Sequence, residues 1–146
     1  MEKLLERKRE LAAIDVLLER RGVVLVEGSA GIGKTSLLDV ACQRATDLEH
    51  EVLRARGSEL EAGFAFGVVR QLLERRLAGA GETERDALLA GPAGAVRPLL
   101  LDELVETSAF DTSFAVLHGL YWLTVNLADR RPLLIAVDDA RRVATL

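Results

Sequence analysis

The chain has 146 residues, of which 49% are hydrophobic and 29% charged, and its formal net charge is −4. Length and composition indicate one ordinary globular domain, and the acidic balance argues against a surface that grips nucleic acid. A single cysteine, Cys42, excludes an internal disulfide. No apolar run approaches the ~20 residues of a membrane span, and the charged start lacks the long apolar stretch of a secretion signal. We therefore expect a cytoplasmic protein that neither enters a membrane nor binds DNA directly.

The first predicted elements are a helix, a strand and a second helix. Apolar residues recur at steps of three, four and seven over residues 3–20, which predicts an amphipathic helix. The run from Val23 to Val26 is apolar without alternation, which is typical of a strand buried on both faces of a parallel sheet. A glycine-rich stretch follows, and residues 34–44 then predict a helix. This strand–glycine loop–helix order is the setting of a phosphate-binding loop.

The glycine-rich stretch reads Gly28-Ser29-Ala30-Gly31-Ile32-Gly33-Lys34-Thr35 and fits the pattern G-x-x-x-x-G-K-[ST] at every fixed position. Glycines let the backbone approach a phosphate closely and adopt positive φ angles, so that successive amides wrap the anion. Lys34 supplies a positive charge for the β- and γ-phosphates, and Thr35 supplies a hydroxyl for Mg²⁺. Ser29, Ala30 and Ile32 fill variable positions, so we expect only their backbone to contact the nucleotide.

The remaining elements alternate between helices and strands. We predict a helix begun by a capping box of Thr83 and Asp86. We also predict a long apolar helix in which Phe114 and Tyr121 lie at helical spacing, with Tyr121 packed in the core or against another helix. The other predictions are strands over residues 51–57 and 133–137, the latter fully buried, and helices over residues 66–77, 96–105 and 112–127. Together these elements predict an α/β fold, a parallel sheet flanked by helices.

Two carboxylates, Asp138 and Asp139, follow the last apolar strand. Hydrolysis of a nucleotide requires a placed metal ion and an oriented water in addition to a phosphate loop. An acid after an apolar strand suits these tasks, with Asp138 holding Mg²⁺ and Asp139 orienting or polarising the attacking water. The alternative interpretation is that one of the two caps a turn, because strands often end in such residues.

Several segments resemble one family of regulators. They are residues 5–11, 24–35, 54–61, 64–72 and 134–140, and together they are similar to the N-terminal ATPase domain of the large ATP-binding regulators of the LuxR family, transcription factors of the STAND group of AAA-like NTPases. The resemblance implies a P-loop NTPase fold, ATP with Mg²⁺ as the cofactors, and a position near the adenine for the segment around Arg7. It spans residues 4–140, so we expect residues 1–146 to form one partial domain of this kind, without a DNA-binding domain.

The same resemblance implies that the sheet is incomplete. In such folds the strand after the second acidic motif lies between the strand of the phosphate loop and the acidic strand. The sequence reads Arg141-Arg142-Val143 after the acidic pair and offers no such strand. We therefore expect unpaired backbone groups and exposed apolar side chains on both flanking strands, a surface through which the chain could associate with itself or with a protein partner.

Three functions remain open from the sequence. The first is an ATP-binding regulatory module with slow or absent hydrolysis, in which the nucleotide biases a conformational switch. The second is a stand-alone ATPase or P-loop kinase. The third is a non-functional gene fragment that folds poorly.

Overall fold

The computed structural model describes residues 7–57, 66–101 and 114–140. Some of the predicted segments lie outside this part of the chain. They are residues 3–6, 102–105 and 112–113 of the predicted helices, and residues 58–61, 64 and 65 of the family-like segments. The elements in order are α2 (Lys8–Glu19), α3 (Lys34–Asp47), β1 (Glu51–Arg56), α4 (Gly67–Ala78), α5 (Glu82–Leu88), the 3-10 helix η2 (Gly91–Val96), α6 (Arg97–Leu100), α7 (Phe114–Ala128) and β2 (Leu133–Asp138).

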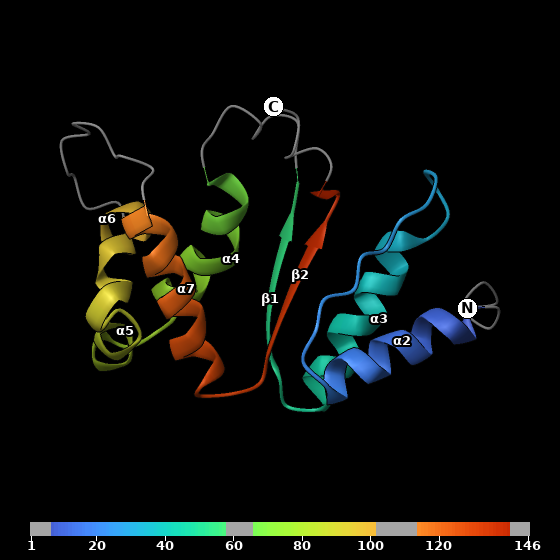
Figure 1. Ribbon diagram of the computed structural model, residues 1–146, viewed down its shortest axis with the longest axis horizontal. Helices are drawn as coiled ribbons and strands as arrows, with labels where there is room; N and C mark the ends of the chain where they lie inside the picture. The colour runs from blue at the N-terminus through green and yellow to red at the C-terminus, as the bar shows by residue number, and fades with distance from the viewer. Residues whose placement is uncertain (1–6, 58–65, 102–113, 141–146) are drawn as a thin grey trace.

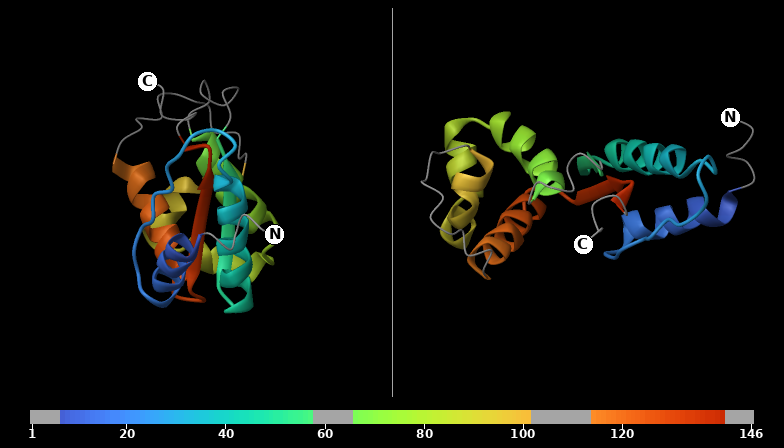
Figure 2. Two further views of the ribbon diagram at one scale, coloured as in Figure 1. Left: turned by 90° about the vertical axis from the view of Figure 1, so that its right-hand side faces the viewer. Right: turned by 90° about the horizontal axis from the view of Figure 1, so that it is seen from above.

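The centre of the molecule is a small parallel sheet (Figure 1). Strands β1 and β2 pair in register from Glu51 opposite Leu133 to Arg56 opposite Asp138. Seen from above, α3 and α4 lie on one side of the sheet and α2 and α7 on the other (Figure 2). The structure thus confirms the predicted α/β class, a parallel sheet flanked by helices.

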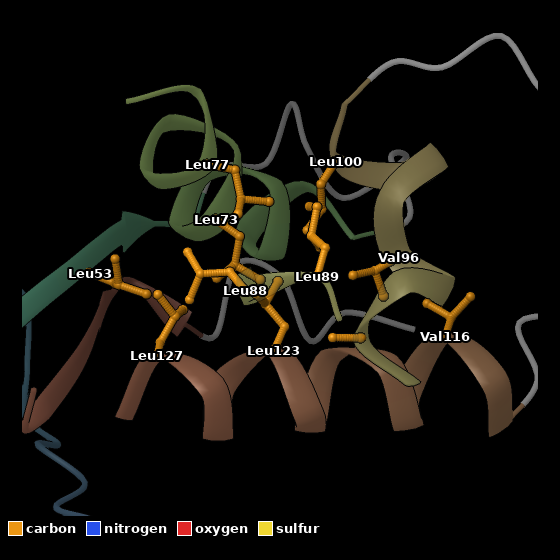
Figure 3. Close-up of a cluster of buried hydrophobic side chains, with 11 residues drawn as sticks. Leu53, Leu73, Leu77, Leu88, Leu89, Val96, Leu100, Val116, Leu123 and Leu127 are labelled. Atoms are coloured by element: carbon orange, nitrogen blue, oxygen red, sulfur yellow. The ribbon is translucent and has the colours of Figure 1, made fainter. Parts of the chain in front are cut away.

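The larger core lies between the sheet and helices α4 to α7 (Figure 3). Leu123 and Leu127 of α7 are fully buried and contribute to the cluster together with Leu53 of β1. Apolar burial of this kind stabilises by roughly 25 cal/mol per Å². The core therefore anchors β1, and with it the parallel partner β2, against the helical part of the chain.

A smaller core joins α2 to α3. It consists of Ile14, Leu37 and Ala41, with Leu11, Leu18 and Val26 packed at its edge. An ion pair between Arg44 and Asp15 joins the same two helices on the surface. These contacts hold the segment that leads into the glycine loop against the helix that follows it.

The prediction of a buried strand at residues 23–26 is wrong. The segment has no strand structure, and Val23 and Leu25 are 94% and 76% exposed. The physical reason is the absence of a partner: among the described residues the sheet has only the strands β1 and β2, and an apolar segment needs a neighbouring ladder to become a strand.

The strand β2 begins at the predicted residue and extends one residue further, to Asp138, but it is not fully buried, because Ile135 is 44% exposed. Ile135 lines the same cleft as Val23 and Leu25. The exposed apolar side chains expected from an incomplete sheet are therefore present.

Two further predictions require correction. Helix α5 begins after Gly81 without a side-chain cap, and Thr83 lies inside it, because the first turn already starts at Glu82. Helix α7 buries Val116, Gly119, Leu123 and Leu127, whereas Phe114 and Tyr121 are 79% and 61% exposed.

The orientation of α7 follows from Gly119. A Cβ at this position would lie 2.9 Å from Cγ1 of Val96 and 3.1 Å from the carbonyl oxygen of Pro92. Only glycine allows η2 to approach α7 so closely, and this approach turns the aromatic side chains outward. No helix among the described residues has the length and apolar composition needed to cross a bilayer.

An ion-pair network joins the start of β1 to the helices. Arg76 pairs with Glu51 and Glu84, and Arg130 also bonds Glu84 at 3.1 Å. The hydrogen bond from Arg76 holds the pKa of the Glu84 carboxyl below its usual range. These charges therefore support the packing of α4, α5 and α7 at the end of the sheet remote from the glycine loop.

Candidate nucleotide-binding site

The glycine loop has the backbone shape of an anion cradle. Gly31 and Gly33 have φ angles of 78° and 87°, which residues with a side chain rarely adopt. Gly33 caps the N-terminus of α3, so the helix begins at Lys34 directly after the loop. Amide groups and the positive end of the helix dipole therefore lie where the motif predicts a phosphate.

The ammonium group of Lys34 lies over the loop. Its Nζ donates hydrogen bonds of 2.8 Å to the carbonyl oxygens of Gly28 and Ser29. An ammonium has three donors and a flexible stem. Lys34 can therefore direct a donor at a phosphate held by the loop.

Thr35 and Asp138 meet although they are 103 residues apart in the sequence. The Oγ1 of Thr35 donates a 2.9 Å hydrogen bond to Oδ2 of Asp138. The other carboxylate oxygen, Oδ1, accepts the backbone N–H of Asp139 at 3.0 Å. Asp138 is 7% exposed, and these bonds offset the cost of removing its charge from water. The first turn of α3 and the end of β2 thus form one site.

Asp139 lies at the end of β2 in a left-handed conformation, with a φ angle of 52°. Its Oδ2 accepts a hydrogen bond from Nε of Arg56 at 3.3 Å. Arg56 pairs with Asp138 in the sheet register, and the backbone N–H of Gly57 bonds the carbonyl oxygen of Asp138 at 2.8 Å. The second acid is thus held by the end of the neighbouring strand.

Arg7 reaches the loop from the start of α2. Its Nη1 donates a 3.3 Å hydrogen bond to the carbonyl oxygen of Gly33. This contact places a guanidinium beside the last residue of the loop. Arg7 therefore lies beside the loop, although it is not among the residues that line the cleft with Lys34 and Thr35.

The loop and the two acids line one cleft of about 1580 Å³. It is larger than the ~300–1,000 Å³ typical of ligand pockets, because it continues along the apolar gap between residues 23–26 and β2. Ala30 lines the cleft, and Ser29, Ala30 and Ile32 are exposed. A backbone role suits these three positions because their side chains are not fixed in a core.

The oxygen donors of the site suit Mg²⁺ better than they suit a metal ion that is coordinated entirely by protein side chains. Among the described residues no group of three or more carboxylate, imidazole or thiol ligands lies together. Mg²⁺ is usually held by one or two protein oxygens together with substrate phosphates and waters. The carboxylate of Asp138 and the hydroxyl of Thr35 fit this pattern.

Comparison with known families identifies the fold. Residues 3–145 match the family described as the AAA ATPase domain. The chain belongs to this family. No curated protein and no solved structure matches the chain. Membership of the AAA ATPase domain family implies ATP binding, and it agrees with the contact between Thr35 and Asp138.

Two residues linked to Asp139 by hydrogen bonds, Arg56 and Gln71, carry no motif in the sequence. The side-chain amide of Gln71 in α4 accepts the N–H of Arg56 and donates to its carbonyl oxygen, both at 3.1 Å. One signal could have found Arg56: the carboxyl ends of parallel strands meet at one edge, so a charged residue ending β1 must lie near Asp138. Gln71 carries no such signal, because its position depends on how α4 packs.

Proposed function

We propose that this AAA ATPase domain is a regulatory module that holds Mg-ATP and hydrolyses it slowly or not at all. The observation that carries this proposal is the 2.9 Å hydrogen bond between Thr35 and Asp138, since it joins the phosphate loop to the acidic strand. The regulatory role rests on the resemblance of the sequence to the ATPase domains of LuxR-family regulators. We also propose that residues 1–146 form a single domain of this kind.

Each site residue has a proposed task. The amides of Gly28 to Gly33 wrap the phosphates, and Lys34 adds its charge at the β- and γ-phosphates. Thr35 and Asp138 hold Mg²⁺, which neutralises charge on the transferred phosphoryl group. Arg7 supports the end of the loop, and the resemblance to the LuxR-family ATPase domains favours a place near the adenine for its segment.

Asp139 is the proposed catalytic residue. Its carboxylate orients or polarises the water whose oxygen bonds the γ-phosphorus while the bond to the β,γ-bridging oxygen breaks, giving ADP and phosphate. An aspartate reaches less far than a glutamate, and this shorter reach favours slow turnover.

The experiment compares turnover with conformational response. Phosphate release is measured at saturating Mg-ATP, and amide hydrogen exchange is compared between ATP- and ADP-loaded protein. We expect turnover below the ~1 s⁻¹ lower end of ordinary enzymes, and exchange in residues 28–35 and 133–140 that differs between the two nucleotides. Turnover at ordinary enzyme rates with identical exchange patterns would instead support the stand-alone ATPase or kinase.

The exposed edge of the sheet supports a second part of the proposal, association with protein. Val23, Leu25 and Ile135 expose apolar surface near the edge of β2, which has no second partner strand among the described residues. This combination favours pairing with another polypeptide. Sedimentation over a range of concentrations tests self-association, with Ile135→Lys as the variant. We expect the wild type to associate more strongly than the variant, and equal behaviour would contradict this part.

A further inference from the structure

The hydrogen bonds at the end of β1 form a chain of contacts from a helix to the proposed catalytic residue. It begins at Gln71 in α4, passes through Arg56 at the end of β1 and ends at the carboxylate of Asp139 after β2. The two outer members are 68 residues apart in the sequence, from 71 to 139. No local preference of the chain explains why an amide, a guanidinium and a carboxylate meet here.

The first contact, between Gln71 and Arg56, fixes the backbone at the end of β1. In a strand the N–H and the C=O of one residue point to the same side, and the next residue points to the other side. The N–H of Gly57 points toward β2, where it bonds Asp138, so the N–H and C=O of Arg56 point away from the sheet. The amide of Gln71 satisfies both, at 3.1 Å each, in the place of a neighbouring strand. Gln71 therefore fixes the end of β1 where an open sheet edge would otherwise fray.

The second contact, between Arg56 and Asp139, fixes the side chain of Asp139. Asp139 is the first residue after β2, and its positive φ angle of 52° is one that few residues with a side chain adopt. Its side chain is 28% exposed, and its carboxylate forms an ion pair with Arg56, whose side chain is 72% exposed. Nε of Arg56 holds Oδ2 at 3.3 Å and leaves Oδ1 for another partner. The direction of Oδ1 thus depends on Arg56.

We propose that Gln71 is a positioning residue for ATP hydrolysis, acting through Arg56 on the carboxylate of Asp139. The inference rests on the proposed function in its slow-hydrolysis form. The hydrogen bonds described above join Gln71 to Arg56 and Arg56 to Asp139, so we expect both residues to affect the chemical step more than the binding of the nucleotide. Helix α4 thereby gains a means of setting the hydrolysis rate, because a shift of α4 moves Gln71.

Single-turnover hydrolysis and Mg-ATP affinity, measured side by side on the full chain, test this inference. Misplacing a catalytic group by about 1 Å can cost up to about 100-fold in rate. We therefore expect Gln71→Ala and Arg56→Ala each to lower the hydrolysis rate roughly tenfold while the Kd for Mg-ATP stays within about twofold. The double variant should be no slower than Arg56→Ala alone, because both act on one carboxylate.

Matched controls separate positioning from general damage. Glu74→Ala removes an ion pair with Arg70 from the same helix as Gln71, and this variant should keep the wild-type rate. Arg56→Lys should restore part of the rate because it keeps the positive charge.

Three results would overturn the inference. The first is an unchanged or increased rate in Gln71→Ala, and the second is a loss of rate matched by an equal loss of affinity. The third is wild-type protein that binds Mg-ATP but shows no hydrolysis dependent on Asp139. Failure of the wild type to bind Mg-ATP at all is a different result, which refutes the proposed function itself.

Discussion

The hydrogen bond between Thr35 and Asp138 should appear as a coupling energy in the stability of the nucleotide-free protein. Its acceptor is a carboxylate that is 7% exposed, and the oxygens lie 2.9 Å apart. Hydrogen bonds to charged groups contribute about 1.5–3 kcal/mol. Because Thr35 is only partly buried, we expect the lower end, a coupling of about 1.5 kcal/mol between Thr35→Val and Asp138→Ala.

A double-mutant cycle measures this energy. The free energy of unfolding in urea is determined for the wild type, both single variants and the double variant. The control cycle pairs Asp138→Ala with Thr46→Val, which lies 11 residues further along α3, about 16 Å at 1.5 Å per residue. The hydroxyl of Thr46 bonds the carbonyl of Cys42 and not the site. The control should be additive to within about 0.5 kcal/mol, and equally small coupling for Thr35 would refute the reasoning.

Further predictions concern the packing and the charges. Leu127→Ala should lower the free energy of unfolding by about 2–5 kcal/mol because the side chain is fully buried, whereas Leu117→Ala, at a position 58% exposed, should change it by less than about 1 kcal/mol in the same urea titration. Gly119→Ala should destabilise the fold by about 1–3 kcal/mol through overpacking. Gly79→Ala should change the stability by less than about 0.5 kcal/mol, because its Cβ would meet its nearest neighbour at an ordinary 3.5 Å. Thermal melts of both variants check this contrast. Because the folded-state pKa of Glu84 is lowered, its contribution is present above the ordinary glutamate pKa of about 4.3 and is lost as the pH falls through the folded-state value. Urea unfolding from pH 7 to pH 3 should therefore show a smaller loss of stability for Glu84→Gln than for the wild type.

The strands and helices that could be predicted from sequence are those whose signal is local. Residues 133–138 form β2 as the apolar run before Asp138 predicts, and the helix after the glycine loop begins at Lys34 as the motif requires. Residues 23–26 carry an equally clear apolar signal and yet form no strand, because a strand needs a partner that no pattern within four residues can supply.

The face of α7 that enters the core also depends on tertiary contacts. Phe114 and Tyr121 are larger and more apolar than Gly119, so periodicity favours burying them. The close approach of η2 at Gly119 decides the outcome, and that approach is a property of two elements together. Hydrophobic spacing identified the helix but not its orientation.

More of the candidate site than of the surrounding fold could be predicted from the sequence. The pattern from Gly28 to Thr35 and the acid at Asp138 each require a particular chemistry, and the structure brings the two together. Arg56 and Gln71 could not be assigned in the same way, because their positions follow from strand pairing and helix packing and not from a motif.

A calorimetric titration with Mg-ATP tests the central claim most directly. The proteins are the wild type, Lys34→Ala, and Lys8→Ala as the matched lysine control on the surface of α2. We predict binding by the wild type and by Lys8→Ala, and loss of that binding in Lys34→Ala, whose ammonium lies over the loop. Absence of binding by folded wild-type protein, or equal binding by wild type and Lys34→Ala, would contradict the account.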